Sequence, residues 1–143
     1  MRLYFDTAYL GKCYWNEPGG RLVRELAQRA DGLYSSAICI AEMACLAHRK
    51  VREGPVTAAD AVVRRDLFLN DLNSGVITAL PVTDRLLRRV ETMTRALPPT
   101  CYLRTIDALH LVTAADFGIG EVWTNDRHML AAAPHFGVSG LSV

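Results

Sequence analysis

The alternation of strand and helix patterns along the chain is the feature that most limits its fold. Short apolar, β-prone runs lie at residues 3–5, 33–35, 76–82, 121–124 and 138–143. Segments with helical periodicity separate them, at residues 8–16, 21–30, 37–50, 57–73, 84–97, 105–117 and 127–133. This alternation predicts a three-layer α/β/α sandwich: a central parallel sheet of four to five strands with helices on both faces.

Length and composition narrow the setting in which the chain works. Its 143 residues fit a single domain, 1–143, large enough to bury a full core. No apolar run approaches the ~20 residues that span a bilayer, which predicts no membrane association. The N-terminus lacks the pattern of a signal peptide, so we expect a cytoplasmic protein. The four cysteines show no paired spacing and are predicted to be buried or free thiols in a reducing compartment.

The first strand introduces the first candidate for a functional group. Residues 3–5 are apolar without alternation, which predicts a central strand buried on both faces. Asp6 and Thr7 follow it directly, where the strand passes into a helix. Ligands bind at this carboxyl end of the strands in open α/β sheets. Asp is also a common helix N-cap, and the pattern leaves both roles open for Asp6.

Glu42 is the acid with the weakest structural explanation. It lies in the segment AICIAEMACLAH, which is apolar almost all round and predicts a largely buried helix. The positions three and four residues away offer no positive charge. Because an isolated buried charge is unfavourable, a partner for Glu42 is expected from elsewhere in the fold. Cys45 and His48 at steps of three residues do not complete a zinc site.

Two more acids stand at corresponding places. Asp107 lies in the first turn of the helix at 105–117, and Asp126 follows the strand at 121–124 as Asp6 follows the first strand. Each also fits a helix end, where acids complement the helix dipole. Arg104, three residues before Asp107, could pair with it or contact a phosphate.

The shared location of the four acids suggests a metal site. If Asp6, Glu42, Asp107 and Asp126 converge, their repulsion prevents full ionisation unless cations are present. Hard oxygen ligands suit Mg²⁺ or Mn²⁺. Such ions activate water and stabilise the charge that develops in phosphodiester displacement.

At this point the sequence resembles a known family. Asp6-Thr7, Glu42 within its helix, the segment RTIDALHL at 104–111 and Thr124-Asn125-Asp126 are similar to the motifs of PIN-domain ribonucleases. The likeness is greatest to the VapC toxins of type II toxin–antitoxin systems, and it extends over essentially the whole chain.

The resemblance implies an endoribonuclease that depends on Mg²⁺ or Mn²⁺ and cleaves RNA phosphodiester bonds. It implies a cognate antitoxin as inhibitor and a homodimer of the toxin. Asp6 and Asp107 would be the chief metal ligands and catalytic acids, and Glu42 and Asp126 would complete the cluster. Supporting hydroxyls would come from Thr7 and Thr124. The chain departs from the family pattern at Ala8, where Ser is common, and at Asn125, where an aromatic residue is frequent.

Two further expectations concern binding surfaces. The helices at 8–16, 21–30 and 57–73 are expected to expose Tyr14 and Trp15, forming an apolar groove for an amphipathic antitoxin helix. Tyr9, Tyr14 and Trp15 could stack on RNA bases or belong to the core. The alternative to a nuclease is a catalytically inactive PIN-like module for protein interaction, in which the acids remain only as helix caps.

Overall fold

A computed structural model of the protein describes residues 1–54 and 56–143. The strands are β1 (Arg2–Phe5), β2 (Gly32–Ser36), β3 (Ile77–Leu80), β4 (Glu121–Trp123) and β5 (Ser139–Leu141). The helices are α1 (Thr7–Tyr14), α2 (Gly20–Arg29), α3 (Cys39–Glu53), α4 (Ala58–Asn73), α5 (Asp84–Arg95), α6 (Thr105–Asp116) and α7 (Arg127–Ala132), followed by a 3₁₀ turn, η1 (Ala133–Phe136). The predicted alternation and the predicted fold class are confirmed.

The five strands form one parallel sheet in the order β3-β2-β1-β4-β5. The chain builds one half from β1 outward to β3, and then returns to the other side of β1 for β4 and β5. The strand order therefore reverses at β1, and such a switch point opens a crevice at the carboxyl ends of the strands. Asp6 is the first residue after β1, so it lies at this crevice.

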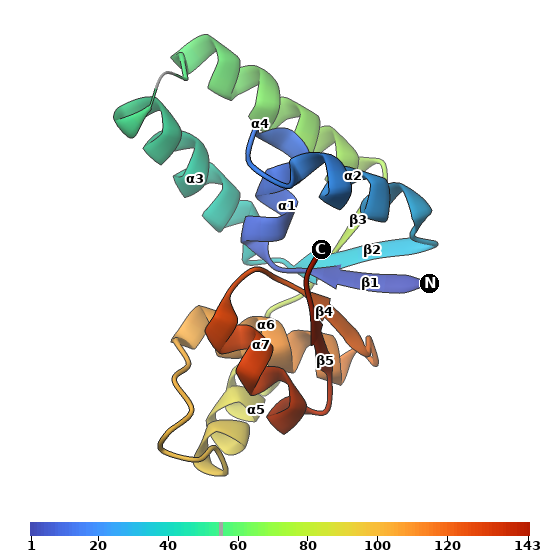
Figure 1. Cartoon of the computed structure of the whole chain (residues 1–143), viewed down its shortest axis with the longest axis vertical. Coiled ribbons are helices and arrows are strands. Elements are labelled where there is room, and N and C mark those ends of the chain that lie inside the picture. Colours follow the sequence, from blue (N-terminus) through green and yellow to red (C-terminus); the bar gives the residue numbers. More distant parts are fainter. Residues whose placement is uncertain (55) are drawn as a thin grey trace.

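Helices cover both faces of the sheet, as Figure 1 shows, with α1 to α4 on one side and α5 to α7 on the other. The side chains of β1 alternate between the two cores. Leu3 and Phe5 pack with residues of α1 to α4, whereas Tyr4 packs with residues of α5 to α7. All three are fully buried, which confirms a central strand buried on both faces.

Helix ends follow the local signals in the sequence. Thr57 caps α4 by accepting a hydrogen bond from the Asp60 N–H, and Thr83 caps α5 by accepting one from Leu86. The last strand is shorter than residues 138–143 but does form the edge of the sheet. The cysteines are free thiols in the structure. Within the described residues, no helix has both the length and the hydropathy to cross a membrane.

The prediction that α3 is largely buried was wrong. Only Cys39, Met43 and Ala47 are buried along it, and Ile40 is 46% exposed. The reason is visible in Figure 1, where α3 and α4 extend together away from the sheet, so that α3 has one covered face and one open face.

Candidate functional site

Asp6 is both a helix cap and a buried acid at the switch point. Its Oδ1 accepts a hydrogen bond from the Tyr9 N–H at 2.8 Å, which caps α1, and its Oδ2 accepts one from the Thr124 hydroxyl at 2.5 Å. The residue is only 5% exposed. Burial raises the pKa of Asp6 above its ordinary value, because loss of water disfavours the charged form more than the hydrogen bond from Thr124 favours it.

Thr124 joins Asp6 to the acid that follows β4. The Thr124 oxygen accepts the Asp126 N–H at 2.9 Å while its proton goes to Asp6. Asp126 in turn caps α7, because its Oδ1 accepts the N–H groups of His128 and Met129 at 2.7 and 3.1 Å. The hydroxyl expected to support the acids therefore links two of them directly.

Arg104 bridges Asp107 and Asp126. Its Nε donates to Asp107 Oδ2 at 3.0 Å, and its Nη2 donates to Asp126 Oδ2 at 3.2 Å. The hydrogen bond to Asp107 raises the pKa of Arg104. The Asp107 side chain is 11% exposed, whereas that of Arg104 is 64% exposed. An exposed guanidinium thus neutralises two carboxylates from the solvent side.

Glu42 is held separately, by donors from two other elements. Its Oε1 accepts a hydrogen bond from the Thr7 hydroxyl at 2.6 Å and lies 3.1 Å from His110 Nε2. Burial alone would raise the pKa of Glu42, but the hydrogen bonds from His110 and Thr7 outweigh it, and the pKa is lowered. The expected partner from elsewhere in the fold is His110, from α6.

His110 is the site residue that sequence reasoning passed over. It is 2% exposed, and its Nδ1 lies 2.7 Å from the Tyr4 hydroxyl. That oxygen also accepts the Ser36 N–H at 3.0 Å, which leaves the Tyr4 proton to be donated to Nδ1. Burial keeps the pKa of Tyr4 well above its ordinary value. Because Nδ1 accepts the Tyr4 proton, the hydrogen bond to Glu42 is assigned to a proton on Nε2 of His110.

A signal for His110 was present in the sequence. It stands three residues after Asp107, one helical turn along the same face of α6. A histidine at that position, between Leu109 and Leu111, needs a hydrogen-bond partner when it is buried.

The four acids thus lie around one end of β1 but in two groups. Asp6, Asp107 and Asp126 are connected through Thr124 and Arg104, and Glu42 is connected to Thr7 and His110. Within residues 1–54 and 56–143, no three or more His, Cys, Asp or Glu side chains are arranged as a ready metal site.

The donor chemistry nevertheless fits a hard divalent cation. The four acids supply only carboxylate oxygens, which Mg²⁺ and Mn²⁺ prefer. Among the described residues, Asp107 Oδ1 and Glu42 Oε2 have no hydrogen-bond donor, so each has an oxygen open to a ligand. Arg104 already shows that Asp107 and Asp126 attract one shared positive charge.

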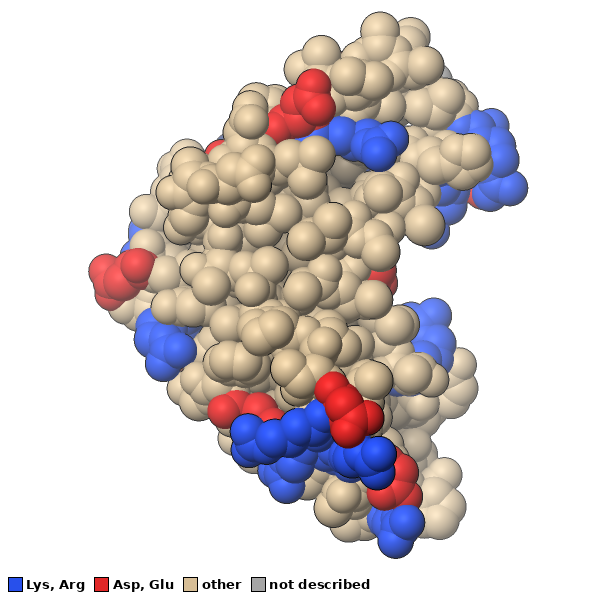
Figure 2. Space-filling model, turned by 180° about the vertical axis from the view of Figure 1, so that it is seen from behind, with Lys and Arg blue, Asp and Glu red and all other residues tan. Residues whose placement is uncertain are grey.

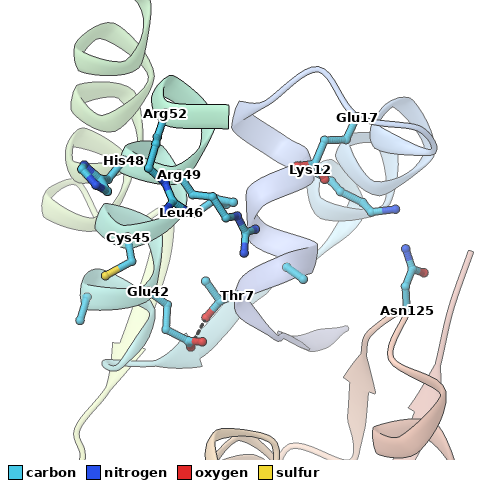
Figure 3. Close-up of a pocket in the computed structure, with 12 residues that line it drawn as sticks. Thr7, Lys12, Glu17, Glu42, Cys45, Leu46, His48, Arg49, Arg52 and Asn125 are labelled. Atoms are coloured by element: carbon cyan, nitrogen blue, oxygen red, sulfur yellow. Dashed lines mark hydrogen bonds between the residues drawn. The ribbon is translucent and has the colours of Figure 1, made fainter. Parts of the chain in front are cut away.

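A pocket of about 750 Å³ opens beside Thr7 and Glu42 (Figure 3). Its walls come from α1 and the loop after it, from α3 and from the loop after β4. The lining residues are Thr7, Ala8, Lys12, Glu17, Ala41, Glu42, Cys45, Leu46, His48, Arg49, Arg52 and Asn125. Ala8 and Asn125, the two departures from the family pattern, both line this pocket rather than the core.

The aromatic residues considered for base stacking do not reach this pocket. Tyr9 is fully buried, and Trp15 is 3% exposed, so both belong to the core. Tyr14 is partly buried and donates its hydroxyl proton to Asp71 on α4 at 2.5 Å. The expectation that Tyr14 and Trp15 form an exposed surface was therefore wrong, because α4 packs over them.

Comparison with known proteins assigns the family. The model of the PIN domain matches residues 3–134, and the chain belongs to this family. Its fold is similar to FitAcB from Neisseria gonorrhoeae, with a TM-score of 0.65 and 15% identity over 97% of this chain and 96% of that one. No curated protein matches the sequence.

Two further structures share the fold. VapBC2 from Rickettsia felis, bound to a DNA fragment from its promoter, gives a TM-score of 0.66 with 14% identity over 100% of this chain and 99% of that one. FitAB bound to an IR36 DNA fragment gives 0.67 with 20% identity over 98% and 94%. The family resemblance predicted from the motifs is confirmed, while identities this low describe the fold alone.

Proposed function

We propose that the protein is an endoribonuclease that uses Mg²⁺ or Mn²⁺ and is the toxin of a type II toxin–antitoxin pair. The observation that carries this proposal is the gathering of Asp6, Asp107 and Asp126, linked by Thr124 and Arg104, at the switch point of a PIN fold. Without bound cations, the carboxylates at this site would repel the phosphate of an RNA substrate, so the site suits an RNA nuclease only if it binds metal ions.

The roles of the residues follow from their contacts. Asp6, Asp107, Asp126 and Glu42 would hold the metal, which when bound supplies an activated water and stabilises charge on the phosphate. Thr124 orients Asp6, and Thr7 orients Glu42. Arg104 is exposed enough to leave the carboxylates and contact a substrate phosphate through its planar fork.

RNA cleavage tests the proposal. Purified protein is incubated with a structured RNA in Mn²⁺, in excess chelator, and in chelator followed by excess Mn²⁺. Cleavage should occur in Mn²⁺, stop in excess chelator and return when excess Mn²⁺ is added. Cleavage that continues undiminished in chelator would contradict the metal role and favour acid–base catalysis by side chains alone.

An antitoxin partner is the second part of the proposal. On α4, Val62, Val63 and Leu67 are each more than half exposed. Beside α4, a groove of about 120 Å³ is lined by Trp15, Ile40, Met43, Ala44, Arg64, Arg65, Phe68 and Leu69. An exposed apolar surface of this kind suits an amphipathic helix.

Co-expression with the neighbouring open reading frame tests the partner. The two products should purify together, and light scattering should give the mass of a complex built on a toxin homodimer. A stable, active protein that the host tolerates without a partner would contradict this part of the proposal.

The alternative, an inactive interaction module, is favoured by one observation: Asp6 and Asp126 both serve as helix caps. A module of this kind needs the caps but not Asp107 or Glu42. It would show neither metal-stimulated cleavage nor a metal-dependent change in stability.

A further inference from the structure

One wall of the large pocket carries positive charge that the proposed acidic site does not use. Lys12 on α1 and Arg49 and Arg52 on α3 line the pocket, together with Thr7 and Glu42. Figure 3 shows Arg49 between α3 and α1, above Thr7 and Glu42, and Lys12 on the side toward Asn125.

Lys12 and Arg49 are the cations of this wall that have no carboxylate partner among the described residues. Glu17, the other acid of the pocket, is paired with Lys50 at 2.7 Å, and Arg52 is paired with Glu53 at 2.7 Å. Within the described part of the chain, neither Lys12 nor Arg49 forms an ion pair. Lys12 Nζ donates only to the backbone oxygen of Pro18, at 3.0 Å.

The shape of the molecule connects this wall to the acids. Figure 2 shows a concave edge with acidic atoms in its deepest part and Lys or Arg atoms above and below it. Because Thr7 and Glu42 belong both to the pocket and to the acidic site, an extended ligand could occupy the two together. The volume of about 750 Å³ lies in the usual range for ligand pockets, about 300–1,000 Å³.

We propose that Lys12 and Arg49 bind backbone phosphates of the RNA strand next to the phosphate at the acidic residues. This inference rests on the proposed function and describes how the RNA backbone runs across the protein surface. Arg49 is suited to a bidentate contact with one phosphate, and Lys12 acts as a point charge on another. The acids repel the strand, so its attraction to the protein must come from cations beside them.

The salt dependence of binding separates phosphate contact from a solvated helix face. A fluorescein-labelled 12-nucleotide single-stranded RNA is titrated with protein in excess chelator, by anisotropy, at several salt concentrations. The variant is K12Q/R49Q. The matched control is R21Q/R88Q, which removes the same charge from two arginines paired with Glu25 and Asp84.

Loss of two phosphate contacts should lower the slope of log K against log salt by about 1.4, at about 0.7 per contact for single strands. The control should keep the wild-type slope. Equal slopes in the two double variants, or no measurable binding by the wild type, would overturn the proposal. R49Q alone, at an exposed position, provides a second variant, with an expected loss of about 0.7.

The outcome is independent of the nuclease activity. If the wild type cleaves RNA with Mn²⁺ but the two double variants bind alike, the phosphate wall is wrong and the proposed function stands. If K12Q/R49Q alone loses slope and no cleavage occurs, the wall binds RNA and the nuclease proposal fails.

Discussion

Asp6 and Glu42 lie at the same end of β1 but experience opposite effects on their pKa. Asp6 is 5% exposed, and burial raises its pKa despite the hydrogen bond from Thr124. The Glu42 side chain is 33% exposed, and donors from His110 and Thr7 lower its pKa despite burial. The comparison shows that the balance between burial and donated hydrogen bonds decides which acid is more readily charged.

Asp6 caps α1 with one oxygen and contacts Thr124 with the other, so its role as a helix cap is confirmed, while its role as a metal ligand stays a prediction. Glu42 caps nothing and depends on contacts with α1 and α6. Substitutions at the two positions should therefore differ in their effects.

The largest expected effect is on cleavage by the Asp6→Asn variant. Loss of the central charge should reduce the rate by more than about 100-fold, beyond the usual effect of a residue that only supports a metal ligand. Metal-free D6N should melt no lower than wild type, because a neutral amide replaces a buried acid. Its oxygen can still accept the Tyr9 N–H, and its N–H can donate to the Thr124 oxygen once the Thr124 proton turns to the Met129 sulfur. Cleavage rates and melting curves check both parts. A larger loss of activity in E42Q than in D6N would reverse the comparison.

Removing His110 should shift the pKa of Glu42 upward, the direction in which the pKa of Asp6 is shifted. In H110L, Glu42 loses a donor and Tyr4 loses its acceptor, so the Glu42 pKa should rise and cleavage should fall about 10- to 100-fold. The buried Tyr4 O–H, left without an acceptor for its proton, should destabilise the protein by about 1–3 kcal/mol. Carbon-13 NMR titration of the Glu42 carboxyl measures the pKa.

The conservative variant H110Q is the control, because its amide N–H can donate to Glu42. In H110Q, the pKa of Glu42 should be lower than in H110L, and part of the cleavage activity should return. If H110L leaves the Glu42 titration unchanged, then His110 is only a packing residue.

The loss of stability at low pH should change in opposite directions in E42Q and in D6N. The lowered pKa of Glu42 contributes stability that is present above its unfolded pKa and is lost as pH falls through the folded value. The raised pKa of Asp6 contributes stability present at low pH and lost as pH rises through its folded value. E42Q should therefore flatten the loss of stability on acidification, and D6N should steepen it.

Urea unfolding between pH 3 and 7 measures this difference, which cannot exceed about 1.4 kcal/mol per pH unit for one proton. The same change of slope in both variants would contradict the opposite pKa directions.

The smallest expected effect is on stability when Arg104 is changed. Its ion pairs with Asp107 and Asp126 are exposed to water and screened by salt, so R104Q should melt close to wild type at 0.15 M salt. A measurable difference should appear only at low salt. A large loss of stability that persists in 1 M salt would show that the bridge holds the two carboxylates together.

Sequence reasoning was reliable where a short stretch contains both partners of an interaction. The Thr57 and Thr83 caps each join residues three apart, and the apolar run of β1 indicates burial on both faces by itself. These signals placed the elements and the end of β1, and with them the position of Asp6.

Contacts between distant segments could not be predicted in the same way. His110 and Glu42 are 68 residues apart, and their contact depends on how α3 and α6 meet across the sheet. Trp15 is buried because α3 and α4 supply Ala47 and Ala61 against it, which no local pattern indicates. The roles of the four acids as metal ligands stay a prediction.

The response of the melting temperature to Mn²⁺ in wild type and in D107N tests the central claim most directly. Mn²⁺ at about 100 times its dissociation constant should stabilise the wild type by about 2.7 kcal/mol, or about 5–10 °C, and D107N should lose most of that shift. D116N, on the same helix and paired with Arg89, should keep it. If D107N responds to Mn²⁺ as the wild type does, the acidic residues at the end of β1 are not a metal site.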